Sequence, residues 1–342
     1  MIDTVHLRHL VPPSMPLSVL LGRAPFLTRC GHTPAENESS TYVLNLPRDD
    51  AVTLPQLTVS TTASGVWCTA ALSVPKHLYG NNVVMVSDAD MTRAFDSVSR
   101  FVTQICGFEF DAHHALVGRA DYCHNFATGE ANVAAYIDVG AMATLPRADR
   151  FKINSTTVLF VTKGKVIKLY GKHAEVSAQR CEGKATGAEL RAAEGKTRLE
   201  VTYRRRDALM RLAARHGLED RRAHQLLTAD VAEGELGHAL GLLGLDKPTR
   251  QQDTRMDVLR EKYGDTKRWH ALVAFVALLD RYGEATWCKD KGGRYASWYG
   301  YSRSTYMANV RLLKSAGAWV RADRQLPPLS LVLPAEHSAQ AA

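Results

Sequence analysis

The hydrophobic pattern of the chain changes near Arg206. Before this residue, short segments rich in Val, Thr, Leu and aromatic residues alternate with Pro and Gly, which is typical of β-strands and turns. After it, apolar residues recur at three- and four-residue intervals, as expected of helices. Strands followed by helices, without regular alternation of the two, predict an α+β fold.

The same patterns predict the positions of individual elements. We expect strands at residues 4–9, 41–46, 56–61, 66–74, 116–126, 156–161, 165–170 and 197–204. We expect helices at residues 88–106, 129–145, 207–216, 219–227, 232–243, 249–263, 266–282 and 302–316. Asp88 or Asp90 is expected to cap the first helix, and residues 182–196 form either a loop or an exposed helix.

The length of 342 residues exceeds one ordinary domain of about 100–200 residues. We expect a mixed sheet-and-helix domain at 1–217 and a mainly helical domain at 218–330. Residues 331–342 are small and polar, and are expected to form a disordered tail.

The composition favours a protein of the cytoplasm that binds an anionic partner. The net charge is +8, and nucleic acid is the commonest anionic partner of basic proteins. The six cysteines contain no Cys-x-x-Cys pair, so they predict reduced thiols and no structural zinc site. The first residues do not form a signal peptide and no stretch approaches 18 apolar residues, so no membrane partner is expected.

Three of the expected strands carry ionisable side chains on one face, where a buried strand would carry Val or Leu. Side chains alternate in direction along a strand. The polar faces contain Val117, Arg119, Asp121, Cys123 and Asn125 in one strand, Val166, Lys168, Tyr170 and Lys172 in another, and Arg198, Glu200, Thr202 and Arg204 in a third. Either these faces look into water, as antiparallel sheets allow, or they converge on a site.

Tyr170 is the candidate nucleophile if the faces converge. It lies between Lys168 and Lys172, and such cations would favour the phenolate and neutralise phosphate oxygens. Lys172 is therefore the second candidate catalytic residue. The alternative is a surface tyrosine at the end of a strand, since strands commonly carry Tyr and Lys.

The neighbouring charged residues suit a bound metal and phosphate. Asp121, Glu175 and Glu200 offer the hard oxygen ligands that Mg²⁺ or Mn²⁺ prefers. Arg119 and Arg198 could each hold phosphate oxygens through two hydrogen bonds. For each of these residues taken singly, a solvated surface position is the alternative.

A basic segment near the C-terminus suits DNA. Residues 289–324 contain eight basic and two acidic residues with interleaved aromatic residues, which can contact phosphates and stack on bases. The helix expected at 302–316, capped by Ser302 or Ser304, resembles the recognition helix of a helix-turn-helix. The alternative is an amphipathic helix, in which Met307, Val310 and Leu313 face the core and the basic residues face solvent. Both can be true of one helix. The candidate DNA contacts in the whole chain are Arg119, Arg198, Arg204, Arg205, Arg206, Arg294, Arg303, Tyr306, Arg311 and Lys314.

Several short motifs, in this order, resemble one protein family. They are the opening Met-Ile-Asp-Thr-Val-His-Leu-Arg, Leu-Tyr-Gly-Asn-Asn-Val at 78–83, Arg-Ala-Asp at 119–121, Tyr-Gly-Lys-His-Ala-Glu at 170–175, Arg-Leu-Glu at 198–200, and Ser-Thr-Tyr at 304–306 leading to Lys314. The sequence resembles the gene II/gene X family of replication initiation proteins from filamentous phages and related plasmids.

The resemblance implies a rolling-circle initiator acting in the cytoplasm of a bacterial host. Such a protein nicks one strand of supercoiled origin DNA through a phosphotyrosine, here on Tyr170, and later rejoins the displaced strand. It implies Mg²⁺ as the cofactor, and a host replication helicase and polymerase as further partners. The implied fold is an antiparallel-sheet nuclease domain related to the His-hydrophobe-His nucleases, followed by a helix-turn-helix-like domain.

The sequence departs from that pattern in its histidines. It has no His-x-His on a strand, so His173 and His124 are only reserve candidates for metal ligands. Two other functions remain open: a non-catalytic origin-binding protein, and a transposase or recombinase with the same chemistry. The Tyr-x-Lys-His-x-Glu element argues against the first, because DNA binding alone does not require it.

Overall fold

The computed structural model describes residues 1–24, 27–30, 41–44, 53–153, 156–247, 255–264, 266–282, 288–289, 295–296, 302–316, 318 and 326–332. The chain forms two compact units. The first contains Met1–Asp246 and Leu329–Ala342, and the second contains Lys247–Pro328. No helix within the described ranges is long and apolar enough to cross a membrane.

The first unit is built on an antiparallel sheet, which has ten strands in the described residues. Their order is β2-β3-β4-β5-β1-β6-β10-β9-β8-β7. The strands are β1 (Ile2–Leu10), β2 (Leu27–Cys30), β3 (Thr41–Leu44), β4 (Gln56–Thr62), β5 (Gly65–Ser73), β6 (Leu116–Ala127), β7 (Asp149–Ile153), β8 (Thr157–Val161), β9 (Lys165–Gly171) and β10 (Lys196–Tyr203). The expected α+β class is confirmed.

Helices complete the first unit and make up most of the described part of the second. In the first unit they are α1 (Leu17–Arg23), α2 (Val74–Tyr79), α3 (Asp88–Cys106), α4 (Glu130–Met142), α5 (Lys172–Cys181), α6 (Gly187–Ala193), α7 (Arg206–Arg215), α8 (Ala223–Leu226) and α9 (Ala229–Leu243). The second unit has α10 (Arg255–Tyr263), α11 (Arg268–Tyr282), α12 (Arg303–Ala316) and a short hairpin of β11 (Cys288–Lys289) and β12 (Tyr295–Ala296).

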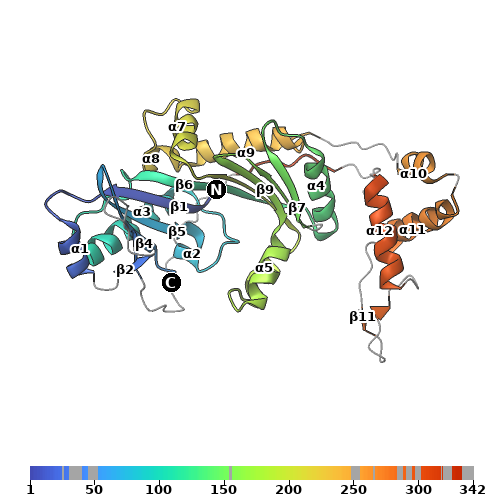
Figure 1. The fold of residues 1–342 in the computed structure, drawn as a ribbon, viewed down its shortest axis with the longest axis horizontal. Helices are drawn as coiled ribbons and strands as arrows, with labels where there is room; N and C mark the ends of the chain where they lie inside the picture. The colour runs from blue at the N-terminus through green and yellow to red at the C-terminus, as the bar shows by residue number, and fades with distance from the viewer. Residues whose placement is uncertain are drawn as a thin grey trace. The chain divides into compact units, whose positions relative to one another are not determined.

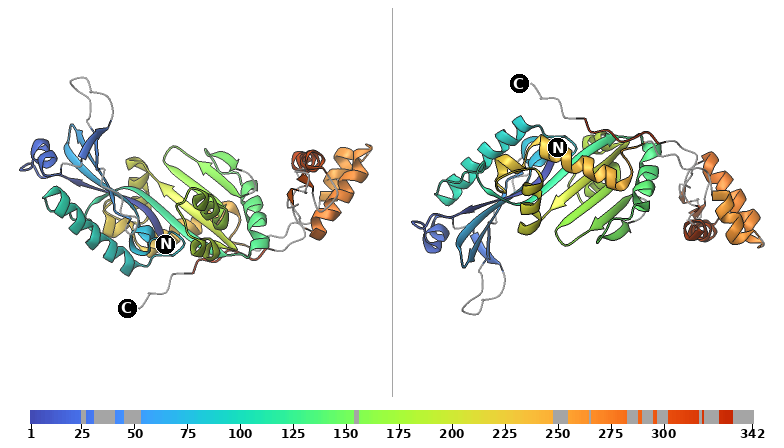
Figure 2. Two further views of the ribbon diagram at one scale, coloured as in Figure 1. Left: turned by 90° about the horizontal axis from the view of Figure 1, so that it is seen from below. Right: turned by 90° about the horizontal axis from the view of Figure 1, so that it is seen from above.

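The sheet has one apolar face, which the larger helices cover. On β10, Leu199, Val201 and Tyr203 are buried on this face. Helix α9 packs against β6 and β10, and α4 packs against β8, β9 and β10. In Figure 1, α7, α8 and α9 lie on one side of the sheet, whereas α5 projects from the other. The two views of Figure 2 agree, because α5 lies in front of the strands from below and α9 lies in front of them from above.

The N-terminus of α3 differs slightly from the expected cap. Ser87 is the N-cap residue, and its hydroxyl accepts a hydrogen bond from the backbone N–H of Asp90. The Asp90 carboxylate accepts in return from the backbone N–H of Ser87, at 3.0 Å. This reciprocal capping box satisfies two backbone donors that would otherwise lack partners.

Two local features change the expected polar faces. β9 ends at Gly171, so Lys172 is the first residue of α5 and does not share the strand face of Tyr170. In β6, the register with β1 shifts at Gly118: His6 pairs with Arg119, and Leu7 pairs with Val117. This bulge turns Val117, which is fully buried, to the helix-covered face.

The boundary between the units lies further along the chain than the expected 217/218. Because α9 packs on β6 and β10, residues 218–246 belong to the sheet unit. The backbone N–H of Leu329 donates to the carbonyl of Leu245 at 2.9 Å, which returns the chain to that unit. Of the expected tail at 331–342, residues 333–342 lie outside the described ranges.

The second unit has its own small core. Helices α10, α11 and α12 pack around buried side chains. These are Leu259, Leu272, Phe275, Val276, Tyr306, Val310, Leu313 and Ala318. Ser302 caps α12, accepting from the backbone N–H of Thr305 at 3.2 Å. The connection between α10 and α11 is short, at residues 264–267. The helix expected to resemble a recognition helix, α12, instead follows the β11–β12 hairpin.

Candidate active site on the polar face of the sheet

Three adjacent strands bring the polar residues of the sequence together. In the sheet, β10 lies between β6 and β9. Arg198 of β10 stands opposite Asn125 of β6 and Tyr170 of β9. Because residues directly opposite on neighbouring strands share a face, Arg198, Tyr170 and Asn125 form one row. Glu200 stands in the next row, opposite Cys123 and Lys168.

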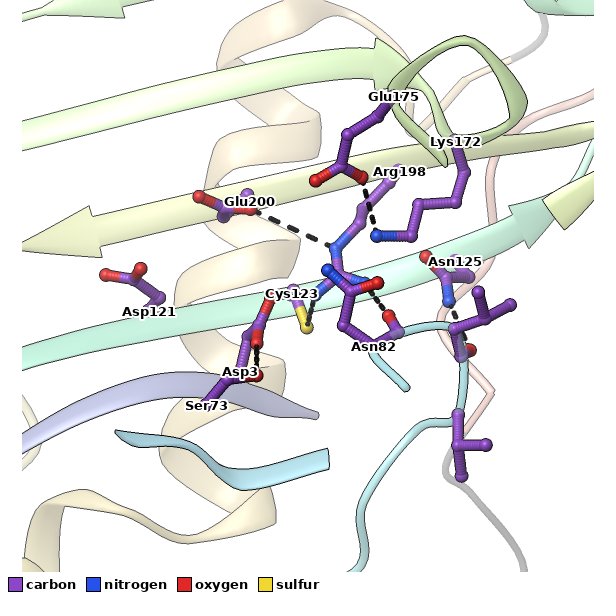
Figure 3. Close-up of polar contacts among 12 residues, drawn as sticks. Asp3, Ser73, Asn82, Asp121, Cys123, Asn125, Lys172, Glu175, Arg198 and Glu200 are labelled. Atoms are coloured by element: carbon purple, nitrogen blue, oxygen red, sulfur yellow. Dashed lines mark hydrogen bonds and ion pairs between the residues drawn. The ribbon is translucent and has the colours of Figure 1, made fainter. Parts of the chain in front are cut away.

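Arg198 is the centre of this cluster and is completely buried. Its Nη1 donates to the carbonyl of Asn82 at 2.7 Å, and its Nη2 donates to Asp3 Oδ2 at 2.5 Å and to Cys123 Sγ at 2.9 Å. Figure 3 shows these groups around the guanidinium, with Glu200 on its other side. Because a buried charge is costly unless it is paired, these partners explain how the core tolerates this residue.

One hydrogen-bond donor of Arg198, its Nε–H, has no acceptor among the described residues. The Oδ1 of the adjacent Asn125 is also without a partner there. Nε lies 3.9 Å from Glu200 Oε2, which is within ion-pair range but too long for a hydrogen bond. Buried polar atoms are almost always hydrogen-bonded, so two such atoms in one row mark this place as unusual.

Tyr170 is also buried, with 2% of its surface exposed. Its hydroxyl donates to Glu200 Oε2 at 3.2 Å, and Lys168 Nζ lies 4.0 Å from the ring centre. Burial raises the pKa of Tyr170 well above its ordinary value, and the opposing effect of Arg198 does not outweigh it. The expectation that flanking cations favour the phenolate is therefore wrong for this conformation, because desolvation dominates.

The carboxyl group that accepts from Tyr170 is perturbed as well. Burial raises the pKa of Glu200 above its ordinary value, while Arg198 and Lys168 oppose the change. A carboxyl group with a raised pKa accepts a proton more readily near neutral pH. Tyr170 and Glu200 therefore form a buried donor–acceptor pair.

Lys172 adds a second buried cation to the site. None of its side chain is exposed, and its Nζ donates to Glu175 Oε2 at 2.6 Å. Burial, aided by the charge of Arg198, lowers the pKa of Lys172 to about 8. Its Nζ lies 5.9 Å from the centre of the Tyr170 ring. The predicted pair of Tyr170 and Lys172 is thus close in space, although Lys172 arrives from a helix.

The three candidate metal ligands do not form one site. Arg119 holds Asp121 through two hydrogen bonds, from Nε at 2.8 Å and from Nη2 at 2.6 Å. Glu175 is bound by Lys172, and Glu200 faces Arg198. Within the described ranges, no three His, Cys, Asp or Glu side chains are grouped so that they could hold a metal ion. These residues do not fit Mg²⁺ or Mn²⁺ in this arrangement.

Neither reserve histidine completes such a site. His124 pairs with Leu199, which places it on the helix-covered face beside Phe126. Burial lowers its pKa to about 4. His173 lies on α5 with 40% of its side chain exposed, and its Nδ1 is 3.9 Å from Glu130 Oε1.

The candidate DNA contacts fall into separate groups. Arg204, Arg205 and Arg206 are exposed where β10 ends and α7 begins, and Arg311 and Lys314 are exposed on α12. Arg198 is no surface contact, because it is buried. Arg294 and the side chain of Arg303 lie outside the described residues.

Tyr306 does not lie on the surface either. It is buried in the second unit, where its ring meets Phe275 edge-on at a centroid distance of 5.2 Å. It therefore stabilises the core of this unit and cannot stack on a base in this fold.

Sequence reasoning missed the groups that reach the cluster from distant elements. Asp3 comes from β1, Asn82 from the loop after α2, and Ser73 donates to Asp3 Oδ1 at 2.7 Å. Asp3 and Asn82 each lie in one of the short motifs that carry the family resemblance, at 1–8 and 78–83, and this was the signal in the sequence that could have placed them in the site.

The resemblance of the sequence to the gene II/gene X family stays a prediction. Comparisons of the chain with models of known protein families and with curated proteins found no match.

Proposed function

We propose that this chain is a rolling-circle replication initiator of the gene II/gene X kind, with Tyr170 as the nucleophile that nicks one DNA strand. The observation that carries the proposal is the buried Arg198 beside Tyr170, with an Nε that has no hydrogen-bond partner among the described residues. Clusters of buried, perturbed ionisable groups are typical of functional sites. A phosphate oxygen of DNA would supply the missing acceptor through a charge-assisted hydrogen bond.

The protons of the proposed reaction have nearby carriers. As Tyr170 Oη forms a bond to phosphorus, its proton passes to Glu200, which already accepts its hydrogen bond. The bond from phosphorus to O3′ breaks, and O3′ takes a proton from the Lys172 ammonium. A pKa of about 8 makes Lys172 a stronger acid than an ordinary lysine. The phosphotyrosine conserves the energy of the broken bond, so a 3′-OH can reverse the step and rejoin the strand.

Cationic side chains provide the charge neutralisation in this scheme. Phosphoryl transfer depends mainly on positioning and electrostatic stabilisation, which Arg198 and Lys172 supply. Asp121, Glu175 and Glu200 are not grouped as metal ligands. No step of the proposed reaction therefore passes through Mg²⁺ or Mn²⁺.

The second unit suits contacts with duplex DNA. The exposed Arg311 and Lys314 lie one turn apart on α12, and Tyr306, Val310 and Leu313 anchor the opposite side of this helix in the core. We infer a role like that of a recognition helix for α12, with these cations on phosphates.

One observation favours a second candidate function. Tyr170 is only 2% exposed and its pKa is raised, which suits a structural tyrosine in a DNA-binding protein without catalysis. A nicking protein must open this site, since Tyr170, Arg198 and Lys172 are all buried and the Asn82 carbonyl already accepts a hydrogen bond from Arg198. The two functions differ in whether a covalent product forms.

Tyr170→Phe distinguishes the two functions. The full chain is incubated with Mg²⁺ and supercoiled DNA of the genetic element that encodes it, and covalent protein–DNA products are separated by denaturing electrophoresis. The wild type should give a covalent band, and Tyr170→Phe should lower it by at least about 1,000-fold, because the nucleophile is lost. DNA binding should persist, since the ring and its packing remain.

Tyr203→Phe is the matched control. Tyr203 is as buried as Tyr170, but its hydroxyl donates to Glu235 on the helix-covered side of the sheet. This variant should retain the covalent band. A band of normal intensity in Tyr170→Phe would mean that another residue is the nucleophile. Tight DNA binding by the wild type with no covalent product would establish the non-catalytic function.

A further inference from the structure

A group of cations lies at the end of the sheet opposite Arg198, where β1 and β10 end and β6 begins. Arg221 is 7% exposed, and its Nη1 donates to the carbonyl of Val117 at 2.5 Å. Burial lowers the pKa of Arg221, and the nearby charges of Arg8 and Arg206 lower it further. We call Arg8, Arg206 and Arg221 the arginine cluster.

The arginine cluster has too little negative charge to balance it. Asp220 is the acidic group that acts on Arg221, and it already binds Arg222 at 2.8 Å. Arg8 and Arg206 form no ion pair with any carboxylate in the part of the chain that the structure describes. The charges of Arg8 and Arg206 both act on Arg221, and an unbalanced group of cations of this kind attracts an anionic ligand.

An aromatic side chain lies beside the arginine cluster on the open face of the sheet. The guanidinium carbon of Arg8 lies 5.0 Å from the ring centre of Trp67, which is partly exposed on β5. The indole N–H of Trp67 donates to Ser64 Oγ at 3.1 Å and so holds the ring in place. A stacked cation and an aromatic ring suit a phosphate and the flat face of a base.

The bulge in β6 makes room for this arrangement. A Cβ atom at Gly118 would lie 3.0 Å from Arg8 Cδ and 3.6 Å from His6 Cβ. Glycine at the bulge therefore lets the Arg8 side chain lie close against the backbone of β6. Arg8 is thus placed by the strands and does not extend freely into solvent.

We propose that single-stranded DNA next to the cleaved bond binds along the open face of the sheet, with its phosphates on the arginine cluster and one base stacked on Trp67. Stacking on an aromatic ring requires an unpaired base, which favours a single strand over a duplex. Arg204 follows directly after β10 and lies six positions along the chain from Arg198, a span of about 20 Å in extended backbone. At about 3.4 Å per nucleotide, a stacked strand of about six nucleotides covers this distance. The direction of the strand toward Tyr170 rests on the proposed function, whereas the binding of single-stranded DNA does not.

The test measures binding of the full chain to a fluorescent 15-nucleotide oligothymidine by anisotropy at several salt concentrations. The double variant Arg8→Met/Arg206→Met should bind more weakly at low salt. The slope of log K against log salt should become shallower by about 1.4, because two phosphate contacts are lost. Trp67→Leu should weaken binding by about 10-fold or more and leave the slope unchanged, because stacking is not a charge effect.

The control removes the same charge elsewhere. Arg100→Met/Arg150→Met changes two exposed arginines on α3 and β7, and should leave affinity and slope close to those of the wild type. Circular dichroism on each variant checks that it is folded. The proposal is wrong if both double variants lose affinity equally, if Arg8→Met/Arg206→Met keeps the wild-type slope, or if Trp67→Leu binds as the wild type does.

This experiment is independent of nicking. If the oligonucleotide results hold and the covalent product is absent, the surface binds single-stranded DNA in a protein that is no nickase. If nicking depends on Tyr170 but the arginine cluster and Trp67 do not affect binding, the strand lies elsewhere.

Discussion

Lys172 belongs to the candidate site, but its buried charge also lowers the stability of the fold. Its side chain is completely buried, and Glu175 is its ion-pair partner. Moving an ammonium group out of water has a high free-energy cost, which one carboxylate offsets only in part. Because burial disfavours the charged ammonium, the pKa of Lys172 falls to about 8.

The pH dependence of stability should reveal the buried charge of Lys172. The native pKa of about 8 lies below the ordinary value of 10.5, so the unfolded chain binds more protons between these two values. The free energy of unfolding therefore rises with pH in this window, by about 2 kcal/mol between pH 7.5 and 9.5 from this group. Lys172→Met should remove that rise, as measured by urea unfolding at both pH values.

An exposed lysine provides the comparison. Lys184 has 65% of its side chain exposed, and Lys184→Met should keep the wild-type pH dependence. An unchanged rise in Lys172→Met would show that Lys172 is not buried as a cation.

The hairpin that leads into the strand of Tyr170 depends on close contact with a helix. The turn between β8 and β9 contains the buried Gly164, whose carbonyl accepts from the backbone N–H of Arg204 at 3.3 Å. A Cβ atom at Gly164 would lie 2.7 Å from Ala208 Cβ on α7. Glycine therefore sets the distance between this hairpin and α7.

Gly164→Ala should lower the free energy of unfolding by about 1–3 kcal/mol, because neither methyl group can rotate away from the other. Gly237→Ala makes the same chemical change on α9, where the nearest atom is 3.9 Å from the added Cβ. It should stabilise the protein by up to about 1 kcal/mol, because alanine favours the helix. Urea midpoints measured at constant m-value test both signs. Equal effects of the two substitutions would contradict the packing of α7 on the hairpin.

The second unit is an insertion in the chain of the first. The chain leaves the first unit after Leu245 and returns at Leu329, and these two residues are joined by a backbone hydrogen bond of 2.9 Å. Among the residues that the structure describes, the buried cluster of the second unit contains no residue of the sheet. A separate core and adjacent chain ends are the conditions under which an inserted unit can be removed.

Replacing residues 248–327 with a short Gly-Ser linker should therefore leave the first unit folded. Its circular dichroism should show one cooperative thermal transition, and its affinity for oligothymidine should stay close to that of the full chain. Affinity for duplex DNA should fall, because Arg311 and Lys314 are removed. Loss of the cooperative transition would mean that the first unit needs the second in order to fold.

Much of the local structure could be predicted from the sequence. Strand β10 and helix α3 lie within one residue of their expected positions, because alternation and the three-to-four spacing of apolar residues are properties of a single segment. The same alternation correctly assigned Arg198 and Glu200 to one face and Leu199 and Val201 to the other. Short elements such as α2 and β7 were missed, because five or six residues carry too weak a periodic signal.

Only the tertiary structure decided the environment of those faces. Asp3 and the Asn82 carbonyl reach Arg198 across 195 and 116 residues, and no local pattern records such contacts. Burial reversed the expected direction of the Tyr170 pKa, because desolvation depends on everything packed around a group. The sequence by itself thus determined which residues could share a face, because side-chain direction follows from the local backbone. The tertiary structure decided which of them are buried, paired or exposed, because those properties depend on segments far apart in the chain.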